Sequence, residues 1–206
     1  MVVTTNVAER KLTRKGQATR DRIVEVATEL IGAHGVAGLN TEHVRERAGV
    51  SGSQLYHYFD SKQALIKAVI TRQAEAPGGL AQIGPLDSFD ALQAWADAAI
   101  ARQSENDGRG ECDLGTLARE LTVSDRESRA EISHGFLRWQ QILRDGLRTM
   151  QDRGELAPAA DIDELSYSLL AALQGGALLS ETLGNTAAMR ASLNAALTYV
   201  RSFATA

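Results

Sequence analysis

The sequence predicts an all-α protein of about nine helices. Apolar residues recur at three- and four-residue steps along most of its 206 residues, which is the spacing of one face of a helix. The chain contains only three prolines, and proline breaks helices more strongly than any other residue. No segment shows the strict apolar and polar alternation of a half-buried strand. A hydrophobic share of 44% and a charged share of 23% are typical of a globular protein with a sizeable core.

A mobile basic arm, residues 1–16, is expected before the first helix, because this stretch is polar and lacks periodicity. A solvated tail without a function is the alternative. Four helices are expected to follow, each delimited by residues that favour a helix start or stop. Their expected ranges are Gln17–His34, Thr41–Ala48, a short helix that starts at Ser51, and Lys62–Glu75.

Capping residues support these limits. Thr41 is expected to be the N-cap of the second helix, and Gly49 ends that helix in the left-handed conformation that glycine tolerates best. Ser51 and Gln54 have the spacing of a capping box, in which each side chain satisfies a free backbone N–H of the first turn. The sequence therefore predicts two short helices separated by a tight turn within residues 17–76.

A second helical unit is expected over residues 77–206. Pro77-Gly78-Gly79 and Gly84-Pro85 interrupt the helical pattern between the units. The charge changes there too: residues 1–75 carry eleven Lys and Arg against eight Asp and Glu, and the remainder carries eleven against eighteen. The net charge of −4 thus divides into +3 and −7, and different partners are expected for the two units. The expected helices are Ser88–Glu105, Leu114–Leu121, Ser124–Arg153 with a capping box at its start, Asp161–Leu183 and Asn185–Phe203.

The densest functional signal is the segment Ala48-Gly49-Val50-Ser51, which joins the two short helices. The spacing predicts a helix-turn-helix, whose second helix enters the major groove of DNA. Gln54 is expected to bind adenine edges, and His57 and the tyrosine hydroxyls to reach phosphates or bases. The outward residues of this helix are small or able to form hydrogen bonds: Gly52, Ser53, Gln54, Tyr56, His57 and Tyr58.

Lys62 lies in the first turn of the next helix, where a cation opposes the helix dipole unless an anion is bound there. We expect it to bind a DNA phosphate; a lysine that extends into water is the alternative. Thr41 and Arg45 lie on the outer side of the helix before the turn and are expected to hold the flanking backbone. A capping role alone is an equal alternative for Thr41. Ser51 completes the predicted DNA-binding set.

Residues Ala27 to Ile70, with GLNTEHVRERAGVSGSQLYHYFDSKQALIKAVI at their centre, resemble the N-terminal domain of TetR/AcrR-family transcriptional repressors. Many members carry Lys-Gly where this chain has Gly52-Ser53. The resemblance implies a homodimeric repressor that binds a palindromic operator in double-stranded DNA and is released by a small molecule. It also implies that the C-terminal helices hold the effector pocket and the dimer interface. Residues 111–115 (ECDLG), with SGSQLYHYF and LLAALQGGALL, are more loosely similar to the LmrA/YxaF-like branch, which often controls drug-responsive operons.

The last two helices are rich in small and apolar residues, and we expect them to pair across a two-fold axis into a four-helix interface. The core of a monomeric bundle is the alternative. An effector pocket needs apolar walls and a few polar groups, and an amide on a buried helix needs a partner. The acidic excess would favour a cationic effector, although such a face also serves solubility. The candidate pocket residues, each of which could instead be ordinary core, are Phe89, Trp95, Phe136, Trp139, Tyr167 and Gln174.

An enzyme is the first alternative, and the sequence lacks the residues that it would need. Glu131-x-x-His134 is half of a di-iron motif, but no second copy is present. Neither a glycine-rich phosphate loop nor an HExxH motif occurs, so we expect neither a metal nor a cofactor. A helical adaptor that binds protein is the second alternative. It would account for the apolar C-terminal helices but not for Lys62.

The cellular context predicted from the sequence is the cytoplasm. No apolar run is long enough for a membrane span, and the first residues have no secretory signal. The single cysteine, Cys112, cannot form an internal disulfide. Its acidic neighbours raise the pKa of a thiol, so a position at a helix entry is favoured over a redox role.

Overall fold

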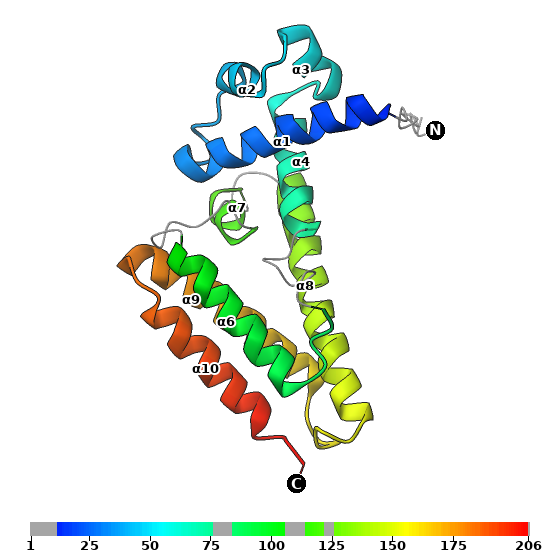
Figure 1. Ribbon diagram of the computed structural model, residues 1–206, viewed down its shortest axis with the longest axis vertical. Coiled ribbons are helices and arrows are strands. Elements are labelled where there is room, and N and C mark those ends of the chain that lie inside the picture. Colours follow the sequence, from blue (N-terminus) through cyan, green and yellow to red (C-terminus); the bar gives the residue numbers. More distant parts are fainter. Residues whose placement is uncertain (1–11, 76–83, 106–113, 122–125, 206) are drawn as a thin grey trace.

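The computed structural model describes residues 12–75, 84–105, 114–121 and 126–205, and over these ranges it confirms the predicted all-α class. Nine helices and no strand are found in these ranges. Figure 1 shows a small unit built from α1, α2 and α3, which α4 connects to a larger helical unit. The helices are α1 (Arg14–His34), α2 (Thr41–Ala48), α3 (Gly52–Tyr58), α4 (Lys62–Glu75), α6 (Phe89–Glu105), α7 (Leu114–Leu121), α8 (Arg126–Asp152), α9 (Ile162–Leu183) and α10 (Ala187–Arg201).

The small unit has its own apolar core. The predicted stripe of α1 is buried against α2 and α4, with Ile23 and Ala27 wholly inaccessible to solvent. Val44 of α2 and Leu55 of α3 close the core from the other side. Because α2 and α3 are only two turns long, most of their stability comes from this burial rather than from intrinsic helix propensity.

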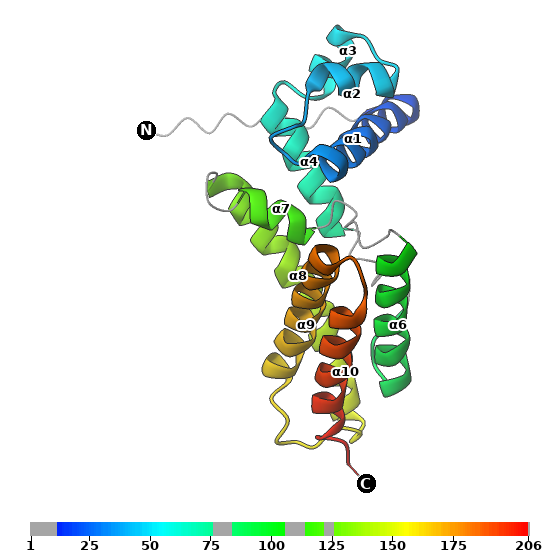
Figure 2. The ribbon, with the colours of Figure 1, turned by 90° about the vertical axis from the view of Figure 1, so that its left-hand side faces the viewer.

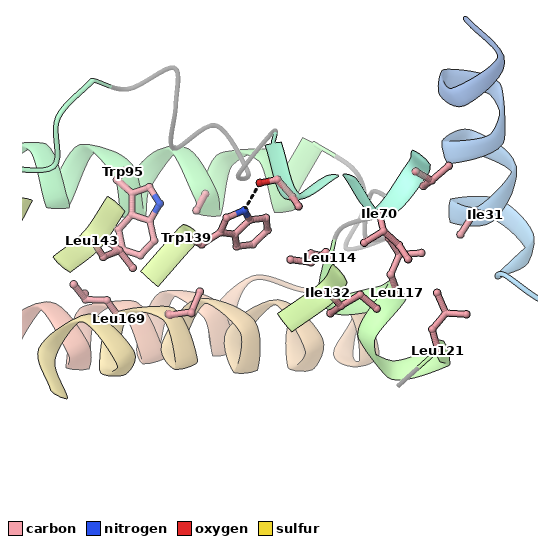
Figure 3. Packing of buried hydrophobic residues seen from close by; sticks show 14 of the residues in the cluster. Ile31, Ile70, Trp95, Leu114, Leu117, Leu121, Ile132, Trp139, Leu143 and Leu169 are labelled. Carbon is pink, nitrogen blue, oxygen red and sulfur yellow. Dashed lines mark hydrogen bonds between the residues drawn. The ribbon is translucent and has the colours of Figure 1, made fainter. Parts of the chain in front are cut away.

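Helix α4 belongs to both units, because it packs against α1 at one end and along α8 at the other. The crossing with α8 is close at Gly135, where an added Cβ would lie 2.8 Å from the Cβ of Ala74. One turn further, the indole N–H of Trp139 donates a hydrogen bond to the Ala74 carbonyl oxygen over 3.2 Å (Figure 3). The two helices are thus fixed both by close packing and by a buried polar contact.

The larger unit is a bundle in which α9 and α10 pack closely as neighbours in sequence and in space (Figure 2). The hydroxyl of Ser192 donates to the Ala172 carbonyl oxygen over 2.9 Å, and the Met189 N–H donates to the Ser180 hydroxyl oxygen over 3.3 Å. Helix α6 covers the inner side of this pair, and its Trp95 is 1% exposed. The inner faces of α9 and α10 are therefore buried by contacts within one chain.

The start of α1, the N-cap of α2 and both ends of α10 differ from those predicted, and α10 spans Ala187–Arg201 rather than Asn185–Phe203. Helix α1 begins at Arg14 rather than Gln17, because the Thr13 hydroxyl accepts the Gly16 N–H and so caps a turn that has no apolar periodicity. Asn40, rather than Thr41, is the N-cap of α2, and its amide oxygen accepts the Glu42 N–H over 2.8 Å. The helix itself begins at Thr41 as predicted, but asparagine and threonine both favour the N-cap position, so the residue types alone could not identify the cap.

Several predicted features lie outside the described residues. They are most of the basic arm, the Pro77-Gly78-Gly79 part of the break, Cys112 and the start of the capping box at Ser124. The capping box of α3 and the left-handed conformation of Gly49 are confirmed, and Asp161, the first residue of the predicted range, is the N-cap of α9.

We expect Gly135→Ala to destabilise the protein. The new methyl group would enter the α4–α8 crossing, and overpacking of this kind costs about 1–3 kcal/mol, more than the helix propensity that alanine adds. His134→Ala, which changes the exposed neighbouring residue, is the matched control. Thermal unfolding followed by circular dichroism measures both variants, and an unchanged melting temperature for Gly135→Ala would contradict the close crossing.

Candidate nucleic-acid interface and effector pocket

The turn between α2 and α3 has the geometry of a helix-turn-helix. Gly49 adopts φ 62° and ψ 42°, and the Val50 N–H donates to the Arg45 carbonyl oxygen over 3.1 Å. The side chain of Val50 is buried and fills the angle between the two helices. Arg22 of α1 donates from Nε to the Ala48 carbonyl oxygen over 2.8 Å, which fixes the end of α2 to the scaffold. The sequence prediction missed this role of Arg22.

The capping box at the start of α3 holds the side chain of Gln54. The Gln54 N–H donates to Ser51 Oγ over 3.2 Å, and the Ser51 N–H donates to Gln54 Oε1 over 2.9 Å. A two-point contact with adenine needs both the amide oxygen and the amide nitrogen of a glutamine. Gln54 would therefore have to leave this cap to bind adenine in that way.

The outer face of α3 is polar and accessible. Tyr56 is 62% exposed, and Ser53, Gln54 and His57 are exposed as well. Tyr58 is half-buried, with its ring edge-on to His57 at 5.2 Å between ring centroids. The inward residues of this segment, which include Leu55, are buried. The predicted outward set is thus displayed on one surface, apart from the partial burial of Gly52 and Tyr58.

Lys62 is the first residue of α4, and the Ser61 hydroxyl accepts the Ala64 N–H over 3.1 Å. The side chain lines a hollow of about 550 Å³ between the α1–α2 connection and α3, together with Thr41 and Tyr56. In the described ranges, Lys62 forms no ion pair with a carboxylate. A free ammonium, two side chains with hydroxyls and a helix start therefore border one hollow, which is suited to a phosphate.

Arg45 is already paired in the structure. It forms an ion pair with Glu42 one turn before it and a longer one, 3.6 Å, with Glu46. The hydrogen bond between Arg45 and Glu42 lowers the pKa of the Glu42 carboxyl and raises the pKa of the guanidinium. A phosphate contact from Arg45 would have to compete with these carboxylates.

The first turn of α1 adds cations that the sequence prediction assigned to the arm. Arg14 and Lys15 are exposed there. The turn lies beside α3, because a Cβ at Gly16 would be 3.5 Å from the Tyr58 hydroxyl oxygen. The basic end of α1 therefore extends the exposed surface of α3.

A second hollow, of about 480 Å³, lies between α7, α8 and α9, and we call it the effector pocket. Three of the six predicted pocket residues line it, namely Phe136, Tyr167 and Gln174. The residues that complete its lining are Gly115, Ala118, Arg119, Leu170, Ala171, Gly175 and Leu178.

The other three predicted residues do not line this pocket. Trp95 and Trp139 are buried in the core (Figure 3), and Trp139 lies behind the pocket wall, edge-on to the lining residue Phe136. Phe89 is half-buried, with the guanidinium of Arg201 over its ring at 5.1 Å from the centroid. The periodicity marked all three as inward residues but could not tell a wall of the pocket from the solid core.

Helix α7 contacts both the effector pocket and the small unit. Arg119 donates from Nη2 to Glu181 Oε2 on α9 over 2.8 Å. The adjacent Glu120 accepts the Val36 N–H, in the α1–α2 connection, at Oε2 over 2.6 Å. Neighbouring side chains of one short helix thus reach α9 on one side and the small unit on the other.

The geometry gives no support to a di-iron site at Glu131. Its carboxylate forms an ion pair with Lys67 of α4 at 3.3 Å, and Lys67 also pairs with Glu127 at 3.0 Å. These hydrogen bonds, chiefly the one with Glu127, raise the pKa of Lys67. Within the described residues, no group of three or more His, Cys, Asp or Glu side chains could hold a metal ion.

A helix-turn-helix on a small helical unit, joined to a larger helical unit with an apolar pocket, defines a DNA-binding regulator. Two family models match the chain: "Bacterial regulatory proteins, tetR family" over residues 23–69, and "Tetracyclin repressor-like, C-terminal domain" over residues 88–196. The chain belongs to the TetR family of transcriptional regulators, which confirms the predicted resemblance. Members of this family are DNA-binding regulators rather than enzymes, and bind DNA operators and small-molecule effectors as dimers.

Similar proteins extend over most of the chain. The transcriptional regulator UidR of Escherichia coli K12 is 23% identical over 177 residues, which are 81% of this chain and 87% of UidR. A TetR regulator from Chloroflexus aurantiacus has a TM-score of 0.78 at 24% identity, covering 93% of this chain and 98% of that one. Reduced E. coli NemR has a TM-score of 0.75 at 19% identity, covering 91% and 98%. At these identities the solved structures establish the fold.

In the part of the chain that the structure describes, no helix has the length and apolar character needed to cross a membrane.

We expect Arg22→Met to destabilise the DNA-binding unit. The substitution removes the hydrogen bond to the Ala48 carbonyl oxygen, and a net loss of about 0.5–1.5 kcal/mol is typical of such a bond. Arg14→Met, at an exposed position of the same helix, is the control for the loss of charge. Urea unfolding measures the difference, and equal midpoints for the two variants would show that the Arg22 contact contributes nothing.

Proposed function

We propose that this protein is a ligand-responsive repressor that binds a palindromic operator in double-stranded DNA as a homodimer and is released by a small molecule. The observation that carries the proposal is the helix-turn-helix, with the polar face of α3 exposed beside the hollow that Lys62 borders. Tyr56 and His57 are exposed and available to base edges, and Ser53 is exposed beside them with its hydroxyl 3.0 Å from Ser51 Oγ. Lys62, Thr41 and the basic end of α1 would bind the flanking phosphates.

The proposed dimer uses the outer faces of α9 and α10. Three leucines near the end of α9 are exposed, Leu178 by 40%, Leu179 by 51% and Leu183 by 60%. A cluster of exposed large apolar side chains on one helix end is typical of an interaction site. Two-fold pairing there would present two α3 helices to successive major grooves, about 34–36 Å apart. This symmetry is the reason to expect a palindromic operator.

The proposed release by an effector depends on α7. An effector in the pocket would contact this helix at Ala118 and Arg119, and the next residue, Glu120, holds the α1–α2 connection. A shift of α7 when the effector binds would therefore move the DNA-binding unit of one subunit relative to that of the other subunit. Since binding to two successive grooves depends on that separation, a small shift would weaken many contacts together. We place this activity in the cytoplasm, as expected for a regulator of chromosomal genes.

Two substitutions separate phosphate binding from base recognition. We expect Lys62→Ala to weaken binding to all DNA sequences alike and to lower the salt slope by about one, because one phosphate contact is lost. We expect His57→Ala to change the preference between sequences, at a cost of about 1–3 kcal/mol for the operator. Fluorescence anisotropy with the upstream intergenic DNA and a scrambled duplex, at several salt concentrations, measures both effects.

Arg138→Ala is the control for these measurements, because it removes a cation from the exposed surface of α8. If Lys62→Ala and His57→Ala both keep the fold and bind DNA with unchanged affinity, the assigned DNA-binding surface is wrong. Binding to neither duplex at any salt concentration would refute the proposed function and favour a protein-binding adaptor.

We expect Leu179→Glu to dissociate the dimer. A leucine buried at an interface contributes about 1.5–3 kcal/mol, and a buried unpaired carboxylate adds a further cost. Leu137→Glu introduces the same charge at a leucine of α8 that is 48% exposed, outside the proposed interface. Sedimentation equilibrium measures the masses of both variants. A dimer dissociation constant that is unchanged in Leu179→Glu would show that this face of α9 is not the dimer interface.

A further inference from the structure

The effector pocket continues into a second, smaller hollow of about 240 Å³ between α7, α8 and α9. The two hollows have four lining residues in common: Ala118, Phe136, Tyr167 and Leu170. All four present apolar surface, so the combined space is an apolar cleft bordered by three helices. A volume of several hundred Å³ is typical of a site for a small organic molecule.

The charges that line this cleft have one sign. Among the described residues, Arg119 is the charged lining residue of the effector pocket and Arg129 that of the smaller hollow. No Asp or Glu of the described ranges lines either hollow, although residues 76–206 carry eighteen acidic against eleven basic residues. The cleft thus has the opposite charge to the unit that contains it.

Both guanidinium groups have hydrogen-bonding capacity to spare. Arg119 uses only Nη2, which donates to Thr116 Oγ1 over 3.1 Å and to Glu181 over 2.8 Å. Its Nε and Nη1 have no partner in the described ranges, and Arg129 forms no ion pair there. The side chains of Arg119 and Glu181 are 38% and 37% exposed, so water screens their ion pair and another carboxylate can replace Glu181.

We propose that the effector is an apolar organic acid, which places its hydrocarbon or aromatic body in the cleft and its carboxylate on Arg119 and Arg129. A planar guanidinium binds a carboxylate through two parallel hydrogen bonds, which neither an alcohol nor an amine can reproduce. Gln174 and Tyr167 supply further polar groups at the wall. This proposal rests on the proposed function, and it reverses the cationic preference that the acidic composition favours.

Three probes of matched chain length test the charge of the effector directly: decanoate, decan-1-ol and decylammonium. Each is titrated into the full-length protein at neutral pH and below its aggregation concentration. Tryptophan fluorescence is the readout, because the Trp139 ring lies edge-on to Phe136 of the cleft at 5.8 Å between ring centroids. We expect decanoate to bind about tenfold more tightly than decan-1-ol, as one charge-assisted hydrogen-bonded pair predicts. Decylammonium is expected to bind most weakly.

Variants then assign the preference to the two arginines. We expect the double variant Arg119→Gln, Arg129→Gln to bind decanoate and decan-1-ol with affinities within about twofold of each other. The two glutamines carry no charge to bind the carboxylate, and they leave the apolar walls of the cleft unchanged. Arg138→Gln, which removes an exposed arginine of α8 that lines neither hollow, is expected to keep the full preference.

Several results would overturn the proposal. They are equal or tighter binding of decan-1-ol or decylammonium, a preference for decanoate that survives the double substitution, and binding of none of the three probes. The last result would show that the cleft does not bind an apolar organic acid. DNA binding of the same preparation is measured separately without a probe, so failure of the proposed function is distinguished from failure of this assignment.

Discussion

The contact between α4 and α8 is the constraint on which the rest of the molecule depends. Helix α4 packs against α1 of the DNA-binding unit and along α8 of the larger bundle, and its position is fixed by the close approach at Gly135 and by the indole of Trp139. Because a close-packed crossing has few alternative arrangements, any movement of the bundle proposed above would be transmitted to the base of the DNA-binding unit rather than absorbed between them. The ion pairs of Lys67 reinforce the same contact closer to α1.

Most of the fold could be predicted because local signals and global packing agree. The apolar stripe of α1, the glycine turn at Gly49 and the capping box at Ser51 each specify a helix limit by themselves, and the structure confirms these limits except for the start of α1. The errors arose where two residues could serve one purpose. Asn40 and Thr41 are both good caps, and Thr13 could cap a turn that the pattern of apolar residues did not reveal.

The predicted sites were harder to derive, because residue type does not reveal which groups a side chain already contacts. Arg45 carries the right charge for DNA but is paired with Glu42, and Gln54 has the right amide but is held in a cap. In the larger unit, the periodicity of apolar residues separates inward from outward positions, but it does not distinguish a residue that lines a pocket from one in the solid core. It therefore grouped the core residue Trp95 with the pocket residue Tyr167, and it gave no reason to expect Arg119 and Arg129 at the same cleft.

The contact of Glu120 with the DNA-binding unit is made to a main-chain N–H, and this has a consequence for how the protein can evolve. A backbone donor is present for any residue except proline at position 36. The local demands are an apolar side chain at the buried position 36 and a glycine at position 35, where φ is +72° and a Cβ would lie 3.0 Å from the carboxylate of Glu120. The residues of α3 could therefore change to another sequence specificity without disturbing this contact. Glu120 and Gly35 would preserve the α7 side of the connection, and the α4–α8 crossing would have to be kept beside it.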